Sequence, residues 1–350
     1  MREILLTLLT ALSKLAGIGT LAALPLLSCA NSTAGNEVPS LVDSLRMADS
    51  IAEAAKPDPL TLEQIQIKRD LLYDKYTPKD TSYYQKKRRV VNLDAVREQL
   101  LIAENLMDKP KPWGVLQNYK NKNGTPKKLK ASGKTKQGAT RDSLGVTRSQ
   151  SIPLNEPFDT VAPVLYARDG SLIFLTDTTR EDFWLGDVGN SLPEHVVPKK
   201  YIQVLPDSTL FGHVIVIDRT NQNMVTLERL ERGSYAIRSI NPVTTGRNKP
   251  PYAQPTPAGI YLLQEKKSRM LYTHDGSNEL AGFAPWANRF TNGAYIHGVP
   301  TANVHGAIRE YSYSLGTVPL SHMCVRTPSS HSKFIFDNFP ALSTLIIVLE

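Results

Sequence analysis

From residue 152 onward, the apolar residues come in short runs that glycine, proline and asparagine interrupt. Short apolar runs between such turn residues are typical of β-strands, and many of them in succession favour a mostly β body. The turn at 220–223 would join two of these strands into a hairpin, and Arg168-Asp169-Gly170 is a second hairpin signal. The candidate strands cover 213–218, 224–228, 235–243 and 260–264. We therefore expect a mainly β fold over this part of the chain.

Two stretches before the β body have helical spacing. In Thr61-Leu62-Glu63-Gln64 a threonine stands three residues before a glutamine, which is the signature of a capping box at a helix start. The positions that follow repeat at helical intervals, as does a second series after Asn92. The two series are Leu62, Ile65, Arg69 and Leu72, and Leu93, Val96, Leu100, Ala103 and Met107. We expect two helices, which could pair across the Thr77-Pro78 break, and assign them a spacer or docking role.

The range 109–150 carries the positive charge of the chain. It holds 11 Lys and Arg residues against one acidic residue, Asp142, a balance of +10, whereas the whole chain has a net charge of +8. A nucleic-acid site would need these cations on a folded face with stacking aromatic residues, and this stretch has almost no apolar content. We therefore predict a disordered basic linker and no binding of nucleic acid. The linker is either simply solvated or follows an anionic envelope surface.

The first 29 residues have the composition of an export signal. Arg2 precedes an apolar run that Lys14 interrupts, and Ser28 stands directly before Cys29. This order is typical of a secretory signal peptide, 1–28, with a lipoprotein-type cleavage site and a lipidated Cys29. The alternative is a membrane anchor in which Cys29 has no role. In both cases we expect an exported, membrane-anchored protein of the cell envelope, facing the periplasm or the cell wall.

The length of the chain predicts more than one unit after the signal. Of the 350 residues, 322 follow residue 28, and a domain typically has about 100 to 200 residues. The predicted units are a helical region over 29–108, the basic linker over 109–150, a β-rich extension over 151–212 and a C-terminal domain over 213–350. The extension could form an extra β layer or one wall of a substrate cleft.

Cys324 is the remaining cysteine once Cys29 is assigned to the lipid. An unpaired thiol in an exported protein is a candidate nucleophile. A free thiol has a pKa of about 8.5 and is mostly protonated at neutral pH, so acyl transfer needs a neighbouring base or cation. Three histidines are near in sequence and could serve as that base: His297, His305 and His322.

The range 213–350 resembles the catalytic domain of the YkuD-type L,D-transpeptidases, which cross-link peptidoglycan. Four landmarks carry the resemblance, in the order of the family: an opening hairpin with Asp218, then Thr245-Gly246 with Thr256-Pro257-Ala258-Gly259, then Tyr295-Ile296-His297-Gly298, and finally Leu315-Gly316 through Ser321-His322-Met323-Cys324-Val325-Arg326. The stretches 334–338 and 344–348 look like the closing helix and strand of the family. The resemblance implies a β-sandwich or barrel with a short helix near the nucleophile.

The resemblance also implies roles for individual residues. It makes Cys324 the nucleophile and His297 the base, and it implies that the carbonyl of Gly298 holds the other imidazole nitrogen. His305 is the rival base, because a glycine also follows it. The backbone amides of Met323 and Cys324 are candidates for an oxyanion hole, and Ser321 is expected to support the turn.

Three positions around the nucleophile keep alternatives open. His322 could help to bind substrate or raise the local positive potential, or it could have a structural role alone. Arg326 could order the pocket or meet a substrate carboxylate with two hydrogen bonds, or it could form a buried ion pair. Met323 stands where the family usually has glycine, so it would be strained if the site requires a positive φ, and otherwise would narrow the acyl-donor channel.

The function that the resemblance implies is two-step acyl transfer between peptidoglycan stem peptides. Cys324 would attack the peptide bond between the third residue and the D-Ala of a tetrapeptide stem, and an amine of a second stem would resolve the thioester. Water as the acceptor would make the protein an L,D-carboxypeptidase. A third possibility is a catalytically impaired wall-binding lipoprotein. We expect no cofactor and no metal, because the histidines lack the spacing of a ligand cluster.

Overall fold

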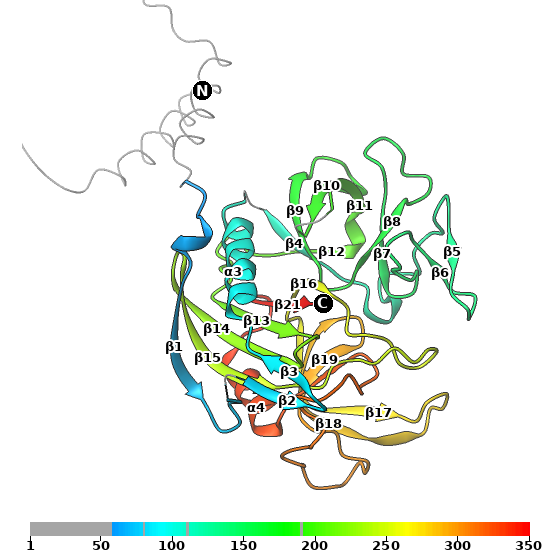
Figure 1. Ribbon diagram of the computed structural model, residues 1–350. Helices are drawn as coiled ribbons and strands as arrows, with labels where there is room; N and C mark the ends of the chain where they lie inside the picture. The colour runs from blue at the N-terminus through cyan, green and yellow to red at the C-terminus, as the bar shows by residue number, and fades with distance from the viewer. Residues whose placement is uncertain (1–57, 80, 110–111, 190–191) are drawn as a thin grey trace, which may run out of the picture. The chain divides into compact units, whose positions relative to one another are not determined.

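The structure is a computed structural model that describes residues 58–79, 81–109, 112–189 and 192–350 (Figure 1). The predicted signal peptide, the predicted lipid site at Cys29 and the rest of the chain up to residue 57 lie outside these ranges. Strands dominate the described residues, which confirms the expected mainly β class. Within these ranges, no helix has both the length and the apolar character that crossing a membrane requires.

A six-stranded sheet of order β1-β15-β14-β13-β21-β16 lies at the centre of the C-terminal part. Its strands are β1 (Gln66–Tyr73), β13 (His213–Asp218), β14 (Asn223–Glu231), β15 (Ser234–Pro242), β16 (Gly259–Leu262) and β21 (Thr344–Leu349). The hairpin expected around 220–223 is confirmed, since β13 and β14 pair in antiparallel fashion with Asp218 opposite Asn223. The last strand, β21, lies between β13 and β16 and runs parallel to β13.

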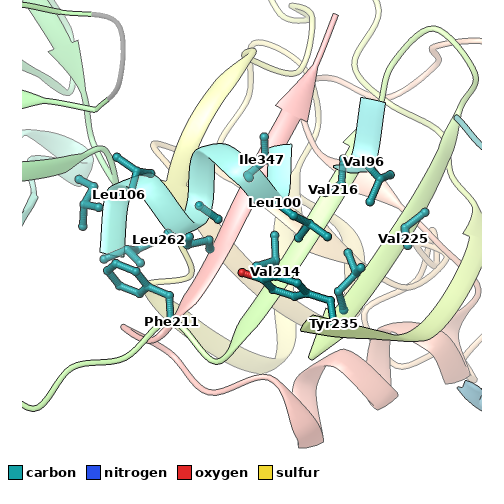
Figure 2. Close-up of a cluster of buried hydrophobic side chains, with 14 of the residues drawn as sticks. Val96, Leu100, Leu106, Phe211, Val214, Val216, Val225, Tyr235, Leu262 and Ile347 are labelled. Carbon is teal, nitrogen blue, oxygen red and sulfur yellow. The ribbon is translucent and has the colours of Figure 1, made fainter. Parts of the chain in front are cut away.

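The side chains of this sheet alternate between two apolar cores. On β13, Val214 and Val216 belong to the first core, and Ile215 and Ile217 to the second, as the two-residue period of a strand requires. The first core lies under helix α3 (Leu93–Met107), whose Leu100 is fully buried (Figure 2). Because both faces are covered, the strand reads as an unbroken apolar run.

The second core joins the six-stranded sheet to a four-stranded sheet of order β17-β18-β19-β20. This core takes side chains from three places: Ile217 from the large sheet, Phe290 from the small sheet and Ile335 from helix α4 (Ser329–Asn338). The strands of the small sheet are β17 (Glu265–Thr273), β18 (Leu280–Thr291), β19 (Ala294–His297) and β20 (Val325–Arg326). Helix α4 begins just after β20, which places a short helix next to the predicted nucleophile, as expected.

Residues 112–205, which we call the accessory body, contain a five-stranded sheet of order β11-β10-β9-β4-β12 with a core of its own (Figure 1). The strands are β4 (Trp113–Leu116), β9 (Leu172–Asp177), β10 (Phe183–Val188), β11 (Glu194–Pro198) and β12 (Ile202–Val204). Smaller elements are the 3-10 turns η2 (Tyr119–Asn121) and η3 (Lys199–Tyr201) and the paired strands β5 (Gly133–Lys134), β6 (Thr140–Arg141), β7 (Ser151–Leu154) and β8 (Leu165–Arg168). Arg168-Asp169-Gly170 forms a turn between β8 and β9, but it is no hairpin, because β8 pairs with β7 while β9 pairs with β4 and β10.

The first predicted helix is wrong beyond its first turn. The Thr61 amide does donate to Gln64 Oε1 at 2.8 Å, but the 3-10 turn η1 (Leu62–Gln64) ends at once. The chain continues as β1, which pairs in parallel with β15 at the edge of the large sheet, and then forms the hairpin β2 (Thr81–Tyr84) and β3 (Lys87–Val90). Its partly buried side chains are Ile67, Leu71 and Tyr73, whose even spacing is that of a strand. Pairing with the sheet therefore outweighs the local helix signal.

The second predicted helix is confirmed as α3, with Asn92 as its N-terminal cap. Glu104 on this helix is fully buried and accepts hydrogen bonds from Arg229, the Tyr235 hydroxyl and the Gly233 amide at 2.8, 2.7 and 3.0 Å. Burial acts to raise the pKa of this carboxyl, but these hydrogen bonds hold it below its ordinary value. The helix is thus docked on β14 and β15 by a charged contact as well as by its apolar face.

The prediction of a disordered linker over 109–150 is wrong in the part that the structure describes. Trp113 on β4 is buried in the first core. Two buried polar side chains order the rest of the range by bonding to the backbone: Asn118 Nδ2 donates to Ser151 O at 2.7 Å, and Asp142 accepts from the Tyr166 amide at 2.9 Å. A few anchors of this kind replace the apolar core that the composition lacks, while most lysines of the range remain exposed.

Candidate active site

A cavity of about 910 Å³ collects most of the predicted site residues. Cys324, His297 and Arg326 line it together with Ser321 and His322. Strand β17 and the start of β18 form another part of its wall. Across the described residues, no three His, Cys, Asp or Glu side chains gather closely enough to hold a metal ion.

Cys324 ends the loop that leads into β20. Its side chain is partly exposed, and Sγ–H donates to the Gly293 carbonyl at 3.6 Å. Burial raises the pKa of the thiol, against the opposing effects of the Tyr295 backbone amide and the Arg326 guanidinium. The thiol is therefore protonated at neutral pH and needs a base to become a nucleophile.

Strand pairing brings His297 close to Cys324. Strands β19 and β20 run parallel with His297 opposite Arg326. The same register places Cys324 beside Tyr295, and His297 lies two residues further on the same face. With strands about 4.8 Å apart and a rise of about 3.3 Å per residue, the two Cα atoms are roughly 8 Å apart. Side chains on one face at this separation can exchange a proton directly or through one water molecule.

The His297 ring is buried and oriented by a backbone carbonyl. Its Nδ1 lies 2.6 Å from Gly298 O, and because a carbonyl oxygen can only accept, Nδ1 carries the proton and Nε2 keeps its lone pair. Burial lowers the pKa of His297 to about 4; the hydrogen bond to Gly298 opposes this change and Arg326 adds to it. The imidazole is therefore neutral at pH 7, which is the form that a general base requires. Gly298 is itself enclosed, since an added Cβ would lie 2.5 Å from Ser329 Oγ.

The rival base, His305, lies outside the cavity. It is exposed in the loop after β19, where its backbone amide donates to Asn303 Oδ1 at 2.8 Å. It is absent from the described residues that line the cavity, whereas His297 is among them. The geometry thus favours His297 as the partner of Cys324.

His322 lines the cavity and contacts the side chain of Asp275. Its Nε2 is 3.0 Å from Asp275 Oδ1, and the two side chains are 46% and 51% exposed. Asp275 belongs to the turn between β17 and β18. His322 therefore links the loop that ends at Cys324 to the β17–β18 hairpin, and this structural contact is made from a position that also lines the cavity.

Arg326 has no carboxylate within ion-pair distance among the residues that the structure describes, so the alternative of a buried ion pair is not observed there. Its backbone is held by Thr244, with which it exchanges two hydrogen bonds of 2.9 Å, and its Nε is buried without a partner in the described chain. Burial lowers the pKa of Arg326, the nearby Cys324 and Tyr272 oppose this change, and Arg247 adds to it. An unpaired guanidinium next to the thiol is suited to receive an anionic group of a ligand.

Met323 is accommodated without strain. The described non-glycine residues with a positive φ do not include it. Its side chain packs against the second core and does not line the cavity; its Cε would lie 3.8 Å from a Cβ added to Gly293. Neither expected consequence of a methionine at this position, strain or a narrowed channel, is therefore found. Ser321 lies where a supporting role requires, because its Oγ donates to the Cys324 carbonyl.

Thr256 and Gly246 hold the loop that ends at Cys324, although in the sequence they are only landmarks of the family resemblance. Thr256 Oγ1 accepts from the Gly246 amide at 2.9 Å and donates to Met323 O at 2.8 Å. Thr256 is fully buried. No residue pattern around it indicates this contact, because its partner lies 67 positions further along the chain.

Gly246→Ala is expected to destabilise the protein. A Cβ at this position would lie 2.3 Å from Gln254 O and 2.9 Å from Met323 Cα. Both contacts are with backbone, so the loop itself must move, and overpacking of this kind costs about 1–3 kcal/mol in the free energy of unfolding. Urea denaturation measures the change. Gly212→Ala is the matched control, since nothing lies within 4 Å of its Cβ position; equal stability of the two variants would contradict the prediction.

Comparison with known proteins places these residues in a family. A model of the L,D-transpeptidase catalytic domain family, YkuD, matches residues 212–348. The matched range contains Cys324 and His297 and begins one residue before β13. No curated protein matches the chain.

Solved structures that match part of the chain include an L,D-transpeptidase from Mycobacterium smegmatis, with 16% identity and a TM-score of 0.32 over 51% of this chain and 82% of that chain. L,D-transpeptidase 3 from Mycobacterium tuberculosis has 16% identity and a TM-score of 0.30 over 48% of this chain and 73% of that chain. A fused Zn-dependent amidase, peptidase and peptidoglycan-binding domain-containing protein from Clostridium acetobutylicum has 16% identity and a TM-score of 0.29 over 41% of this chain. The match spans about half of that protein, 55% of its length. It is the family model, together with the order of the motifs in the sequence, that identifies residues 212–348 as an L,D-transpeptidase catalytic domain of the YkuD family.

Proposed function

We propose that this protein is a peptidoglycan L,D-transpeptidase that carries an acyl group from a tetrapeptide stem, through a thioester on Cys324, to an amine of a second stem. One observation carries the proposal: the Cys324 thiol and a neutral His297, oriented by Gly298, share one cavity. The family of the domain supports this class of reaction. Because peptidoglycan lies outside the cytoplasmic membrane, the proposal includes export, in agreement with the signal-like N-terminus.

In the first step, Cys324 Sγ attacks the carbonyl carbon of the third stem residue while His297 Nε2 takes the thiol proton. A carbon–sulfur bond forms, and the carbonyl oxygen becomes an oxyanion. We assign its stabilisation to the backbone amides of Met323 and Cys324. His297 then gives its proton to the nitrogen of the departing D-Ala, the carbon–nitrogen bond breaks, and a thioester remains.

In the second step, the amine of another stem attacks the thioester. His297 takes a proton from this amine, the new amide bond forms as the carbon–sulfur bond breaks, and the proton returns to the sulfur of Cys324. Water in place of the amine would release a tripeptide. Because burial disfavours the charged form of both Cys324 and His297, the resting pair is neutral and the proton moves when the substrate is attacked.

Arg326 is proposed to bind the terminal carboxylate of the donor stem. This carboxylate belongs to the D-Ala that leaves, so it lies close to the bond that Cys324 cleaves. The guanidinium lines the same cavity and has no carboxylate partner among the described residues. A planar guanidinium can hold a carboxylate with two parallel hydrogen bonds, which would also orient the scissile bond.

The products of the reaction test the proposal. The protein is incubated with purified disaccharide tetrapeptides, and the mixture is examined by mass spectrometry. We expect release of D-Ala together with cross-linked dimers, and we expect iodoacetamide to block both after labelling Cys324, as peptide mapping would show. If tripeptides form without dimers, the activity is L,D-carboxypeptidation and not transpeptidation. An unchanged substrate beside an unreactive thiol would overturn the proposal in favour of a wall-binding protein.

A further inference from the structure

The accessory body reaches the cavity of Cys324 through the turn η2. Of the accessory-body residues that the structure describes, Tyr119 and Lys120 line this cavity. They come from the basic range 109–150, which lies outside the matched catalytic domain. Part of the wall of the site is therefore built by residues that the family model does not cover.

The conformation of this turn is unusual and is held in place by side chains. Lys120 has a φ angle of 55°, in a region that residues with a Cβ seldom adopt, and it is followed by Asn121 at 54°, a residue type that enters this region more readily. The Lys120 amide donates to Gln150 Oε1 at 2.8 Å, and the Gln150 amide donates to Asn121 Oδ1 at 2.7 Å. Residues are kept in such conformations where the surrounding structure enforces them, often at binding sites.

Asp169 fixes the turn to the accessory body and to the catalytic domain at once. Its carboxylate is fully buried, and Oδ1 accepts from the Asn118 and Tyr119 amides at 2.7 and 3.0 Å. Its Oδ2 accepts from Arg289 Nη1 at 2.6 Å and from the Asn292 amide at 3.1 Å. Asn292 directly precedes Gly293, whose carbonyl contacts the sulfur of Cys324. One carboxylate thus sets the position of η2 relative to the nucleophile.

Positively charged side chains outnumber negatively charged ones around the cavity, and Lys120 contributes a positive charge from the wall that the accessory body forms. Among the described residues that line it, four Lys and Arg side chains face one Asp: Lys120, Lys267, Arg269 and Arg326 against Asp275. Lys267 is paired with Glu265 at 3.1 Å, and Arg269 stacks on the ring of Phe283 at 3.9 Å. Lys120 lies over the ring of Tyr119 at 5.5 Å and has no carboxylate within ion-pair distance in the described chain.

We propose that Lys120 binds a carboxylate of the stem-peptide substrate, so that the accessory body is part of the substrate site and determines its specificity. The inference rests on the proposed function and adds a second anion contact to it. Arg326, next to the nucleophile, already serves the carboxylate of the departing D-Ala. Lys120, on the wall made by the accessory body, therefore meets another carboxylate, either further along the donor stem or on the acceptor stem.

Kinetics of Lys120→Ala test this inference. The variant should raise the KM for a substrate with free carboxylates about fivefold to tenfold, the range for loss of a partly exposed charged hydrogen bond, and leave kcat nearly unchanged. Substrates in which the carboxylate is a carboxamide should bind the wild type and the variant equally. Amidating the donor in one series and the acceptor in the other shows which stem Lys120 contacts. Lys120→Arg should restore the lower KM, because it keeps the charge.

Lys122→Ala is the matched control. Lys122 is two residues away, donates to Gln117 Oε1 at 2.6 Å and is not among the described residues that line the cavity, so its loss should leave KM unchanged. If the wild type turns over its substrate while Lys120→Ala keeps the same KM and the same preference for acid over amide, the inference fails and the proposed function stands. If the wild type forms no product and its thiol is inert, the proposed function fails first, and the inference fails with it.

Discussion

Replacement of Cys324 by alanine is expected to abolish both D-Ala release and cross-link formation while the fold is retained. Without the sulfur no thioester can form, and loss of a covalent nucleophile lowers turnover by about 10⁴-fold or more. The side chain is partly exposed and contacts Gly293 O at 3.6 Å, so its removal should change the free energy of unfolding by about 1 kcal/mol or less. Mass spectrometry of the products measures the first effect, and thermal unfolding the second.

Cys324→Ser is the control for size and polarity. A serine hydroxyl fits the same space and can still donate to Gly293 O, but it is a far weaker nucleophile than a thiolate when no stronger base is present. This variant should therefore be inactive as well and as stable as the wild type. If the alanine variant released D-Ala at the wild-type rate, the reaction would have to proceed by direct attack of water, and the covalent mechanism would be rejected.

The β body from residue 213 onward was predictable because the strand pattern in its sequence agrees with the burial of those strands in the fold. Strand β13 is buried on both faces, so its apolar run and its turn at 220–223 are visible in the sequence. The roles of Cys324, His297 and Gly298 depend on motifs whose order is preserved along the chain, and they could be proposed without coordinates. What the motifs could not predict is which consequence Met323 would have, because that depends on packing against the second core.

The region before residue 213 was harder to predict because its order depends on contacts between distant segments. The capping signature at Thr61 is present, yet parallel pairing with β15 turns the following residues into a strand. In the range 109–150, buried polar side chains such as Asn118 and Asp142 order the chain by bonding to the backbone. The hydropathy and charge of the sequence do not predict which polar residues are buried in this way. Asp169 reads as a turn residue in the sequence. That it joins two parts of the chain is known only from the structure, in which the amide of Asn292, 123 positions away, donates to its carboxylate.

His297→Asn is expected to lower kcat/KM by about 10²–10⁴-fold, the usual contribution of a general base. The asparagine amide can still donate to Gly298 O in place of Nδ1, so the loop should keep its conformation, but it cannot accept the thiol proton. Alkylation of Cys324 by iodoacetamide at neutral pH should slow as well, because burial raises the pKa of the thiol and no base remains to lower the cost of ionisation. Steady-state kinetics and alkylation rates measure the two effects.

The pH profile of kcat/KM distinguishes this role from a purely structural one. Because burial lowers the pKa of His297 to about 4, the base is available above this pH and is lost as the pH falls through it. The wild type should therefore remain active at pH 5 to 6, below the ordinary histidine pKa of about 6.5, and lose activity near pH 4. On the alkaline side, the raised pKa of Cys324 keeps the thiol protonated beyond the range of an ordinary cysteine.

His305→Asn is the matched control for the choice of base. His305 is exposed in the loop after β19 and is not among the described residues that line the cavity, so its substitution should leave both kcat/KM and the pH profile unchanged. An acidic limb in the wild type that His305→Asn abolishes and His297→Asn retains would assign the base to His305. Such a result would require the loop after β19 to fold over the thiol during turnover. The buried imidazole of His297, which bonds to Gly298 O, would then have a structural role alone.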